Sequence, residues 1–576
     1  MRATGSPDVA GGAPARRPGK PAAVPPAHLC QPKDSLYIAP MLDTAQSQGS
    51  GAADVPDFAR RRTFAIISHP DAGKTTLTEK LLLASGAIRM AGHVKARGER
   101  RRTRSDWMEI EQQRGISVTS SVMTFERDGI VFNLLDTPGH SDFSEDTYRT
   151  LSAVDAAVMV IDAAKGIESQ TRKLFEVCRL RDIPIFTFVN KVDRESLDPI
   201  ALMDEVSSTL ALDLTPLTWP IGMGVDFRGL IDIANKKALL ATERGGPLVR
   251  EVPFESPEDL IDLEGVEERI INEAVESLTL ALGVLPPFDL ASFREGHLSP
   301  VYFGSALKEA GVAELLFGLG SVGPSPLPRM AKGRVVEPAE DLVSGFVFKV
   351  QANMDPNHRD RVAFVRLCSG RFKRGMKLYN AREKRQMAIA NPIFFFAQER
   401  ETVDEAVAGD IIGIPNHGML RVGDTLSEGE TIRFEGLPDF APEILRRVLL
   451  SDPMKAKQLQ KALQDMAEEG VVQVIKPVSD PSPIVGVVGT LQLDVLAARL
   501  EKEYGVPIRY EAVSFVTARW IVGERAEVDR FMEQNRSSTA RDRDEAPVYL
   551  ARSQWVLDRA IEEWPKLKFV AVKERG

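Results

Sequence analysis

Three short groups of polar residues each follow an apolar run, and their types and spacing suit chemistry on a phosphate. The first lies in the stretch from Phe64 to Thr76, which reads as a short strand, a turn and then Gly73-Lys74-Thr75. In a phosphate-binding loop, backbone N–H groups and the start of the next helix surround the phosphates. Lys74 would reach the β- and γ-phosphates, and the Thr75 hydroxyl would bind Mg²⁺. Ser68 replaces the usual first glycine, which weakens the match slightly.

The second group ends the run Val131–His140, which reads Val-Phe-Asn-Leu-Leu-Asp-Thr-Pro-Gly-His. Asp136 is placed to hold Mg²⁺ through water. Gly139 has no side chain to block approach, so its N–H group can meet the γ-phosphate. Such a loop is tethered by the triphosphate and released after hydrolysis, so we interpret it as a γ-phosphate sensor.

The third group closes the run Ile185–Asp193, which ends Asn-Lys-Val-Asp. The Asp193 carboxylate can accept hydrogen bonds from guanine N1–H and the 2-amino group, and adenine lacks both donors. Lys191 can lay its aliphatic stem along the base. The four-residue pattern is weak alone, but its order after the other two groups is specific. The sequence therefore predicts GTP or GDP with Mg²⁺, rather than ATP.

A fourth, shorter signal is Gly304-Ser305-Ala306, which closes a strand and could offer backbone N–H groups to guanine O6. The full set of predicted nucleotide-binding residues is Ser68, His69, Pro70, Asp71, Ala72, Gly73, Lys74, Thr75, Thr76, Asp136, Thr137, Pro138, Gly139, His140, Asn190, Lys191, Val192, Asp193, Ser305 and Ala306.

These groups need a sheet that brings strand ends together. Strand-like runs occur at Phe64–Ser68, Val131–Leu135, Ala157–Ile161, Ile185–Val189 and Val301–Phe303. Helical patterns separate most of them, as at Gln170–Leu180 and Leu197–Leu210. This alternation predicts a doubly wound, mostly parallel sheet. Ligands of such sheets bind at the carboxyl ends of the strands, where the predicted site lies.

The pattern along the chain predicts an α/β multidomain protein. We expect a GTP-binding domain over residues 58–328 with an insertion at about 224–300, acidic around Glu251–Glu268. After this domain, apolar and polar residues alternate with a period of two, which predicts an antiparallel β-barrel over 335–432. Residues 437–576 read as a C-terminal α+β domain with a ferredoxin-like order of elements.

Composition narrows the function classes. The chain has 576 residues, a net charge of −9 and three scattered cysteines without metal spacing, so we expect several domains and a reducing, cytoplasmic setting. No apolar run is long enough to span a membrane.

Residues 1–57 are rich in Ala, Pro and Gly and are predicted to be disordered, with Met41 as an alternative start. The basic run Lys95–Arg104 reads first as a solvated loop and second as an RNA-phosphate contact.

Together, Arg114-Gly-Ile-Ser117, Asp136-Thr-Pro-Gly-His140 and Asn190-Lys-Val-Asp193 resemble the translational GTPases of elongation factors G and Tu. Within that group the chain is similar to the bacterial peptide chain release factor 3 family. The stretches that carry this similarity are Ser68–Thr76, Ser105–Glu109, Met354–Val362 and Gly489–Asp494, and the resemblance covers about residues 58–573.

The resemblance implies roles for further residues. Ser117 falls at a switch position whose hydroxyl meets Mg²⁺ and the γ-phosphate, which gives Thr75, Ser117 and Asp136 as metal ligands. His140 falls at the position that orients the attacking water on the ribosome, and with Lys74 it forms the expected catalytic pair. Pro70 and Ile116 would lie beside it as apolar gate residues.

The resemblance also implies partners, namely the ribosome, through rRNA and ribosomal proteins, and class-I release factors, with the chain acting as a monomer. The implied role is to promote dissociation of class-I factors after peptide release. Two alternatives stay open: another translational GTPase acting in elongation or rescue, and a GTP-dependent binding switch with little turnover.

Overall fold

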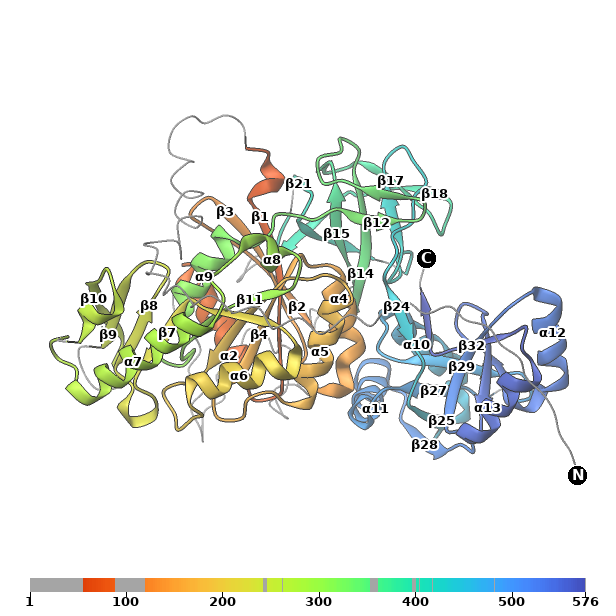
Figure 1. Cartoon of the computed structure of the whole chain (residues 1–576). Helices are drawn as coiled ribbons and strands as arrows, with labels where there is room; N and C mark the ends of the chain where they lie inside the picture. Colours follow the sequence, from red (N-terminus) through yellow and green to blue (C-terminus); the bar gives the residue numbers. More distant parts are fainter. Residues whose placement is uncertain are drawn as a thin grey trace, which may run out of the picture.

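The computed structural model describes residues 55–88, 120–241, 246–261, 263–352, 361–395, 400–402, 404–416, 418–480 and 482–574. Figure 1 shows an N-terminal α/β domain, which is the predicted GTP-binding domain, then an all-β domain and a C-terminal domain. The basic run Lys95–Arg104, the stretch Arg114–Ser117 and the N-terminal tail up to residue 54 lie outside the described residues.

The N-terminal α/β domain is organised around a seven-stranded sheet with the order β2-β3-β1-β4-β5-β11-β6. All neighbouring strands are parallel except β2 and β3, which are antiparallel. The strands are β1 (Arg61–Ser68), β2 (Ser121–Arg127), β3 (Ile130–Asp136), β4 (Ala156–Asp162), β5 (Ile185–Asn190), β6 (Asp213–Pro216) and β11 (Leu298–Phe303). The predicted doubly wound, mostly parallel sheet is therefore confirmed.

Helices cover both faces of this sheet, because alternate residues of each strand point into separate cores. Phe64 and Ile66 of β1 join one apolar cluster, with α2 (Lys74–Ala84) and α9 (Val312–Ser321). Ala65 and Ile67 join the other, with α4 (Ser144–Ser152), α5 (Ser169–Arg179) and α6 (Pro199–Leu210). Burial on both faces explains why the strands read as continuous apolar runs.

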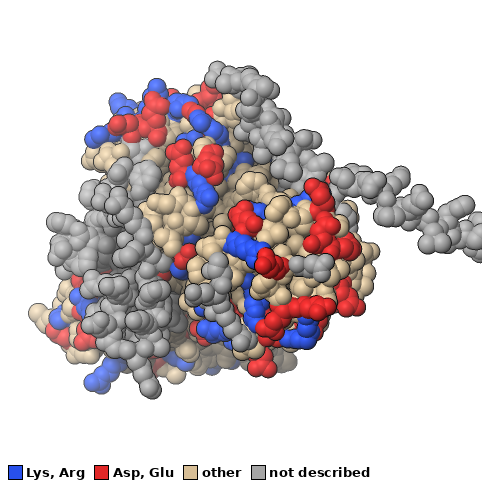
Figure 2. All heavy atoms as spheres, turned by 90° about the vertical axis from the view of Figure 1, so that its left-hand side faces the viewer, with Lys and Arg blue, Asp and Glu red and all other residues tan. Residues whose placement is uncertain are grey.

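The insertion forms a second sheet. It is antiparallel with the order β10-β9-β8-β7, and its first strand begins at Thr218, before the expected boundary at Gly224. Its elements are β7 (Thr218–Ile221), η4 (Gly224–Asp226), β8 (Gly229–Asp232), β9 (Lys237–Ala241), β10 (Leu248–Pro253), η5 (Pro257–Leu260), α7 (Glu268–Val284) and α8 (Leu290–Arg294). Figure 2 looks from the side on which the insertion lies in Figure 1 and shows clustered Asp and Glu side chains there.

The second domain is an antiparallel β-structure. Its main sheet has eight strands in the order β18-β17-β23-β14-β15-β22-β19-β20, and β16 and β21 form a separate pair. The strands are β14 (Ser344–Ala352), β15 (Arg361–Ser369), β16 (Arg371–Lys373), β17 (Lys377–Asn380), β18 (Arg385–Ala388), β19 (Ile393–Phe395), β20 (Arg400–Thr402), β21 (Glu405–Val407), β22 (Ile411–Pro415) and β23 (Thr425–Ser427), preceded by the hairpin β12 (Arg329–Ala331) and β13 (Arg334–Val336). Inward residues such as Val347, Val365 and Ile412 share one buried core.

The C-terminal domain holds two ferredoxin-like units rather than one. Within its eight-stranded sheet, the order β28-β25-β27-β26 gives the first unit and β32-β29-β31-β30 gives the second, and β26 pairs with β30 to join them. Each unit runs strand–helix–strand–strand–helix–strand along the chain. The expectation of a single ferredoxin-like order of elements over residues 437–576 is therefore corrected.

The elements of the first unit are β25 (Ile444–Leu450), η6 (Pro453–Lys455), α10 (Ala456–Glu469), β26 (Gln473–Pro477), β27 (Ile484–Val487), α11 (Thr490–Tyr504) and β28 (Ile508–Ala512). Those of the second are β29 (Thr517–Val522), α12 (Arg525–Gln534), η7 (Arg536–Ser538), β30 (Thr539–Arg541), β31 (Pro547–Ala551), α13 (Gln554–Glu563) and β32 (Lys568–Val570). A short pair, β24 (Pro438–Phe440) with β33 (Val572–Glu574), closes the domain. No helix in the described part of the chain has the length and apolar character needed to cross a membrane.

A buried ionic cluster joins the N-terminal α/β domain and the β-domain. Asp155, which precedes β4, is fully buried and pairs with Arg366 of β15 and with Arg329 at 2.9 Å. Lys349 of β14 is also buried and contacts Asp146 of α4 at 3.3 Å. Burial alone would raise the pKa of Asp146, but Lys349 and hydrogen bonds from Ser120 outweigh it and hold that pKa below its usual value.

Candidate functional site

The predicted site residues within the described chain lie on loops at the carboxyl ends of β1, β3, β5 and β11, which are all parallel strands of one sheet. Asn190 joins three of these loops. Its Nδ2 donates to the Ala72 carbonyl at 2.8 Å, and its Oδ1 accepts from the backbone N–H groups of Lys191 and Ala306, both at 2.9 Å. Asn190 is only 2 % exposed, so this network is buried.

Gly73 is required at the end of the phosphate loop for two reasons. Its φ of +97° lies in the left-handed region that glycine adopts without strain. A Cβ atom there would also lie 2.2 Å from Asn190 Nδ2. The tight packing of Gly73 on Asn190 therefore fixes where the loop meets α2.

Lys191 connects the phosphate loop to β4. Its Nζ donates to the Asp71 carbonyl at 2.5 Å and to Asp162 Oδ2 at 2.7 Å. Burial would raise the pKa of Asp162, but hydrogen bonds from Lys191 and the Ala164 N–H, together with the charges of Lys191 and Lys165, hold that pKa below its usual value. Sequence reasoning missed Asp162, although its place at the end of an apolar strand matches that of Asp136.

Asp193 lies in the loop that Asn190 organises and is half-buried. The preceding Val192 is buried, and its N–H donates to the Gly304 carbonyl at 3.2 Å. Within the described residues the Asp193 carboxylate has no hydrogen-bond or ionic partner. A carboxylate held this way is able to accept the two hydrogen bonds predicted from guanine.

Ser305 and Ala306 lie beside this loop, but their backbone N–H groups, which were expected to bind guanine O6, already donate to other protein atoms. The Ser305 N–H donates to the Ala310 carbonyl at 3.0 Å, and the Ala306 N–H donates to Asn190. Both N–H groups therefore have protein partners in this arrangement, and their contact with guanine O6 stays a prediction. Their observed contacts instead tie the loop after β11 to Asn190.

Lys74 and Asp136 form a buried ion pair where the phosphate loop meets the loop after β3, with side chains 6 % and 2 % exposed. The donors here suit Mg²⁺, because the Asp136 carboxylate and the adjacent Thr75 hydroxyl are hard oxygen ligands. Among the described residues, no group of three or more His, Cys, Asp or Glu side chains could hold a metal by itself. Magnesium here would thus depend on hydroxyl, phosphate and water oxygens as well.

The loop after β3 lies against the phosphate loop. The Thr137 hydroxyl donates to the Ile66 carbonyl at 2.7 Å, and Pro138 is buried. A Cβ atom at Gly139 would lie 3.7 Å from the Pro70 backbone. The Gly139 backbone is therefore close to the loop predicted to hold the phosphates.

His140 follows on this loop and is partly exposed, at 36 % for its side chain. Its Nδ1 lies 3.2 Å from the Asp142 backbone nitrogen, which donates to it, and 3.3 Å from Asp142 Oδ1. The His140 ring also makes an edge contact with Phe143, with centroids 6.3 Å apart. Asp142 and Phe143 therefore set the orientation of the imidazole.

His69 has a partner that the sequence did not indicate. Its Nε2 lies 2.5 Å from Glu168 Oε2, just before α5. Burial lowers the pKa of His69, against the opposing pull of Glu168. The buried Ser68 Oγ and His69 Nδ1 have no hydrogen-bond partner in the described part of the chain. Ser68 ends β1 and His69 begins the predicted phosphate loop, so both atoms lie next to the predicted phosphate site.

The other predicted residues have simpler positions. Thr76 lies half-buried in the first turn of α2, and Pro70 is half-buried in the turn before it. Ser117 and Ile116 fall outside the described residues, so the proposed third metal ligand and the gate stay predictions.

Three family descriptions match consecutive parts of this chain. They are the elongation factor Tu GTP binding domain over residues 59–324, elongation factor G domain 2 over 342–429, and the class II release factor RF3 C-terminal domain over 434–561. The chain is also similar to a crystal structure of a protein from Thermus thermophilus, with 28 % sequence identity and a TM-score of 0.63. That similarity covers 80 % of this chain and 68 % of the other.

Proposed function

Because the chain belongs to the translational GTPases of the release factor 3 type, we propose that it hydrolyses GTP on the ribosome during termination. In this proposal, ribosomes stimulate hydrolysis, and the protein promotes dissociation and recycling of class-I release factors after peptide release. The observation that carries the proposal is the release factor C-terminal domain at 434–561, joined to a GTPase domain whose phosphate and base loops meet at Asn190.

The base-recognition step is assigned to Asp193 and Lys191. The Asp193 carboxylate accepts from guanine N1–H and the 2-amino group, and the Lys191 stem covers the base. Adenine would leave that carboxylate without partners, so ATP is rejected by the cost of an unpaired charge.

The hydrolytic step is phosphoryl transfer to water, in which positioning and charge neutralisation supply most of the catalysis. Lys74 carries positive charge to the β- and γ-phosphates, and Gly139 offers its N–H group to the γ-phosphate. His140 orients the attacking water. As the new bond from water to phosphorus forms, the bond to the bridging oxygen breaks. Thr75 and Asp136, with Ser117, would hold Mg²⁺, which when bound neutralises phosphate charge.

We further propose that the protein works as a monomer in the cytoplasm, where ribosomes are found. Sedimentation of the purified chain with GDP tests the oligomeric state, and we expect a single species at the mass of one chain, 63.4 kDa. A stable dimer at micromolar concentration would contradict the proposal.

The decisive experiment measures GTP turnover with no ribosomes, with empty ribosomes, and with post-termination ribosomes carrying a labelled class-I factor. We expect turnover to rise with ribosomes and the labelled factor to leave faster when GTP is present. Ribosome-stimulated turnover without factor release would favour a role in elongation or rescue. Tight GTP binding with no stimulated turnover would favour a binding switch.

A further inference from the structure

The residue that contacts His140 also contacts the C-terminal domain. Asp142 lies in the short helix η3 (Ser141–Phe143), and its Oδ2 accepts from the Leu491 backbone N–H at 2.8 Å. Leu491 lies in the first turn of α11, in a distant part of the chain. One carboxylate therefore links the catalytic loop to a helix of another domain.

Electrostatics favour this contact, because a carboxylate is stabilised at the positive N-terminal end of a helix. A second contact between the domains places a positive charge at the negative, C-terminal end of a helix. Arg149 of α4 donates to the carbonyl of Gly470, at the C-terminal end of α10, at 3.0 Å. The segment from Asp142 to Arg149 thus places an anion at the start of one helix and a cation at the end of another.

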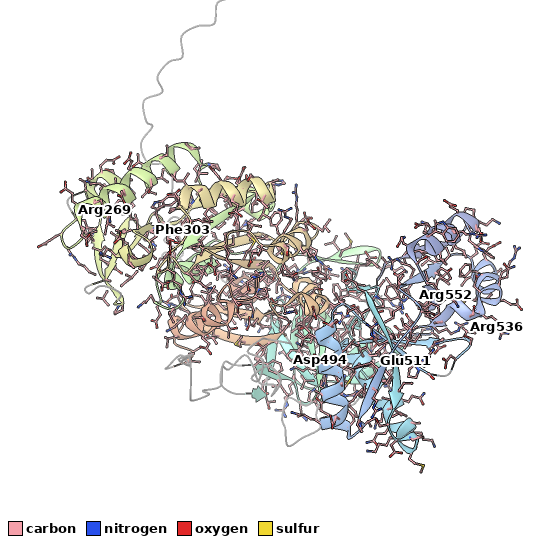
Figure 3. All side chains as sticks on the ribbon, turned by 90° about the horizontal axis from the view of Figure 1, so that it is seen from below. Arg269, Phe303, Asp494, Glu511, Arg536 and Arg552 are labelled. Atoms are coloured by element: carbon pink, nitrogen blue, oxygen red, sulfur yellow. The ribbon has the colours of Figure 1, made fainter. Side chains whose placement is uncertain are left out.

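Apolar packing supports the same junction. Phe143 is 5 % exposed and Val495 of α11 is 1 % exposed, and the two share a small buried cluster against which Leu491 packs. Figures 1 and 3 place α11, marked by Asp494, on the side of the C-terminal domain nearest the GTPase domain, whereas Arg536 and Arg552 lie at its far end. The first ferredoxin-like unit, rather than the second, therefore docks on the catalytic loop.

Gly489 shows how close this docking is. A Cβ atom at Gly489 would lie 1.9 Å from Asp142 Cγ and 2.3 Å from each carboxylate oxygen. The φ of Gly489 is −137°, which any residue adopts without strain. Glycine is therefore needed here for space, so that the Asp142 carboxylate can reach the start of α11.

From these contacts we propose that Asp142 is a positioning residue through which docking of the C-terminal domain fixes His140 for hydrolysis. This inference rests on the proposed role of His140 in orienting water. Asp142 holds the imidazole through its backbone N–H, which donates to Nδ1, while α11 holds the Asp142 side chain in place.

The test uses the full-length chain and a substitution in the distant domain. Gly489→Ala introduces a methyl group where Asp142 now lies, so the loop must move. Gly283→Ala is the matched control, because no atom lies within 4 Å of the added Cβ and that glycine belongs to α7. We expect Gly489→Ala to lower kcat for ribosome-stimulated hydrolysis by roughly 10- to 100-fold with little change in KM, as a small misplacement of a catalytic group does.

A second pair of variants separates positioning from folding. Asp142→Asn keeps an oxygen that accepts from Leu491 N–H, whereas Asp142→Ala removes it. We expect Asp142→Ala to reproduce the kcat defect and Asp142→Asn to recover most of the activity, with GTP affinity unchanged in both. A merely structural role would instead lower GTP affinity and thermal stability together.

Hydrogen exchange of the backbone amides over residues 139–145 in the GDP-bound protein gives a readout that does not need ribosomes. We expect faster exchange in Gly489→Ala than in wild type and Gly283→Ala. Unchanged exchange, or an unchanged or raised kcat in Gly489→Ala, would overturn the inference. If wild type shows no stimulated turnover, the proposed function fails, and the exchange result still decides whether α11 holds the loop.

Discussion

The side-chain amide of Asn190 donates to the carbonyl oxygen of Ala72 at 2.8 Å, and the same side chain accepts from the Ala306 N–H group at 2.9 Å. The residue at the start of the base-recognition motif therefore shapes the phosphate loop. In the proposed site, this one buried amide would couple binding of the base to binding of the phosphates, so a change at the phosphate loop should disturb both.

Gly73→Ala tests this coupling. The added Cβ would overlap Asn190 Nδ2, and a left-handed φ strains alanine by about 1–2 kcal/mol, so we expect at least a roughly tenfold loss of GTP affinity. Gly86→Ala is the control, because its φ is +79° but no atom lies within 4 Å of the added Cβ. It should share the strain and keep GTP affinity. Equal affinities of the two variants, measured with a fluorescent GDP analogue, would contradict the role of Asn190.

Asp193→Asn tests the guanine assignment. An amide cannot accept both hydrogen bonds from guanine, so we expect GTP affinity to fall roughly 100-fold, given typical values for charged hydrogen bonds. Xanthosine triphosphate carries an oxygen at the 2-position and should bind the variant better than the wild type. Competition binding with both nucleotides measures this exchange of preference. Unchanged GTP affinity would show that Asp193 does not read the base.

His140→Ala tests the hydrolytic role. The imidazole is partly exposed and is held by Asp142 rather than by the phosphate loop, so we expect GTP and GDP affinity to be retained. Ribosome-stimulated single-turnover hydrolysis should fall by roughly 100-fold or more, as for a lost proton-handling or water-orienting group. Quench-flow measurement of phosphate formation gives the rate. Hydrolysis at the wild-type rate would count against His140.

Asp155→Ala tests the buried ionic cluster between the first two domains. The change leaves the guanidinium of Arg366, only 1 % exposed, without its carboxylate, so we expect a loss of about 3–5 kcal/mol in the free energy of unfolding. Glu563→Ala breaks an exposed pair with Arg559 and should cost about 1 kcal/mol or less. Urea unfolding followed by fluorescence compares the free energies of unfolding of the two variants. Similar midpoints for both variants would show that the cluster contributes little.

Several helices are predicted closely from the sequence. The pattern over Gln170–Leu180 indicates the helix that the structure places at Ser169–Arg179, because an amphipathic period of 3.6 is a local property. The loops at the ends of β1, β3 and β5 are also predictable, since a parallel sheet brings its carboxyl strand ends to one edge.

The second ferredoxin-like unit was not predictable in the same way. Its strand β30 (Thr539–Arg541) has three residues, too few for a period to be visible, and its other strands read only as isolated strand-like pieces. Pairing across distant positions, as between β26 and β30, decides their place. Short strands acquire their identity from their neighbours, which only the folded chain supplies.

The chemistry expected of this protein can be derived from its sequence, because each functional group lies within a short contiguous motif. Which residues hold those groups in place is visible only once the chain is folded. The contacts of Lys191 with Asp162, of His69 with Glu168 and of Asp142 with Leu491 join separate elements. No local pattern encodes such a contact, since it depends on how domains pack and on glycines such as Gly489 that leave room for it.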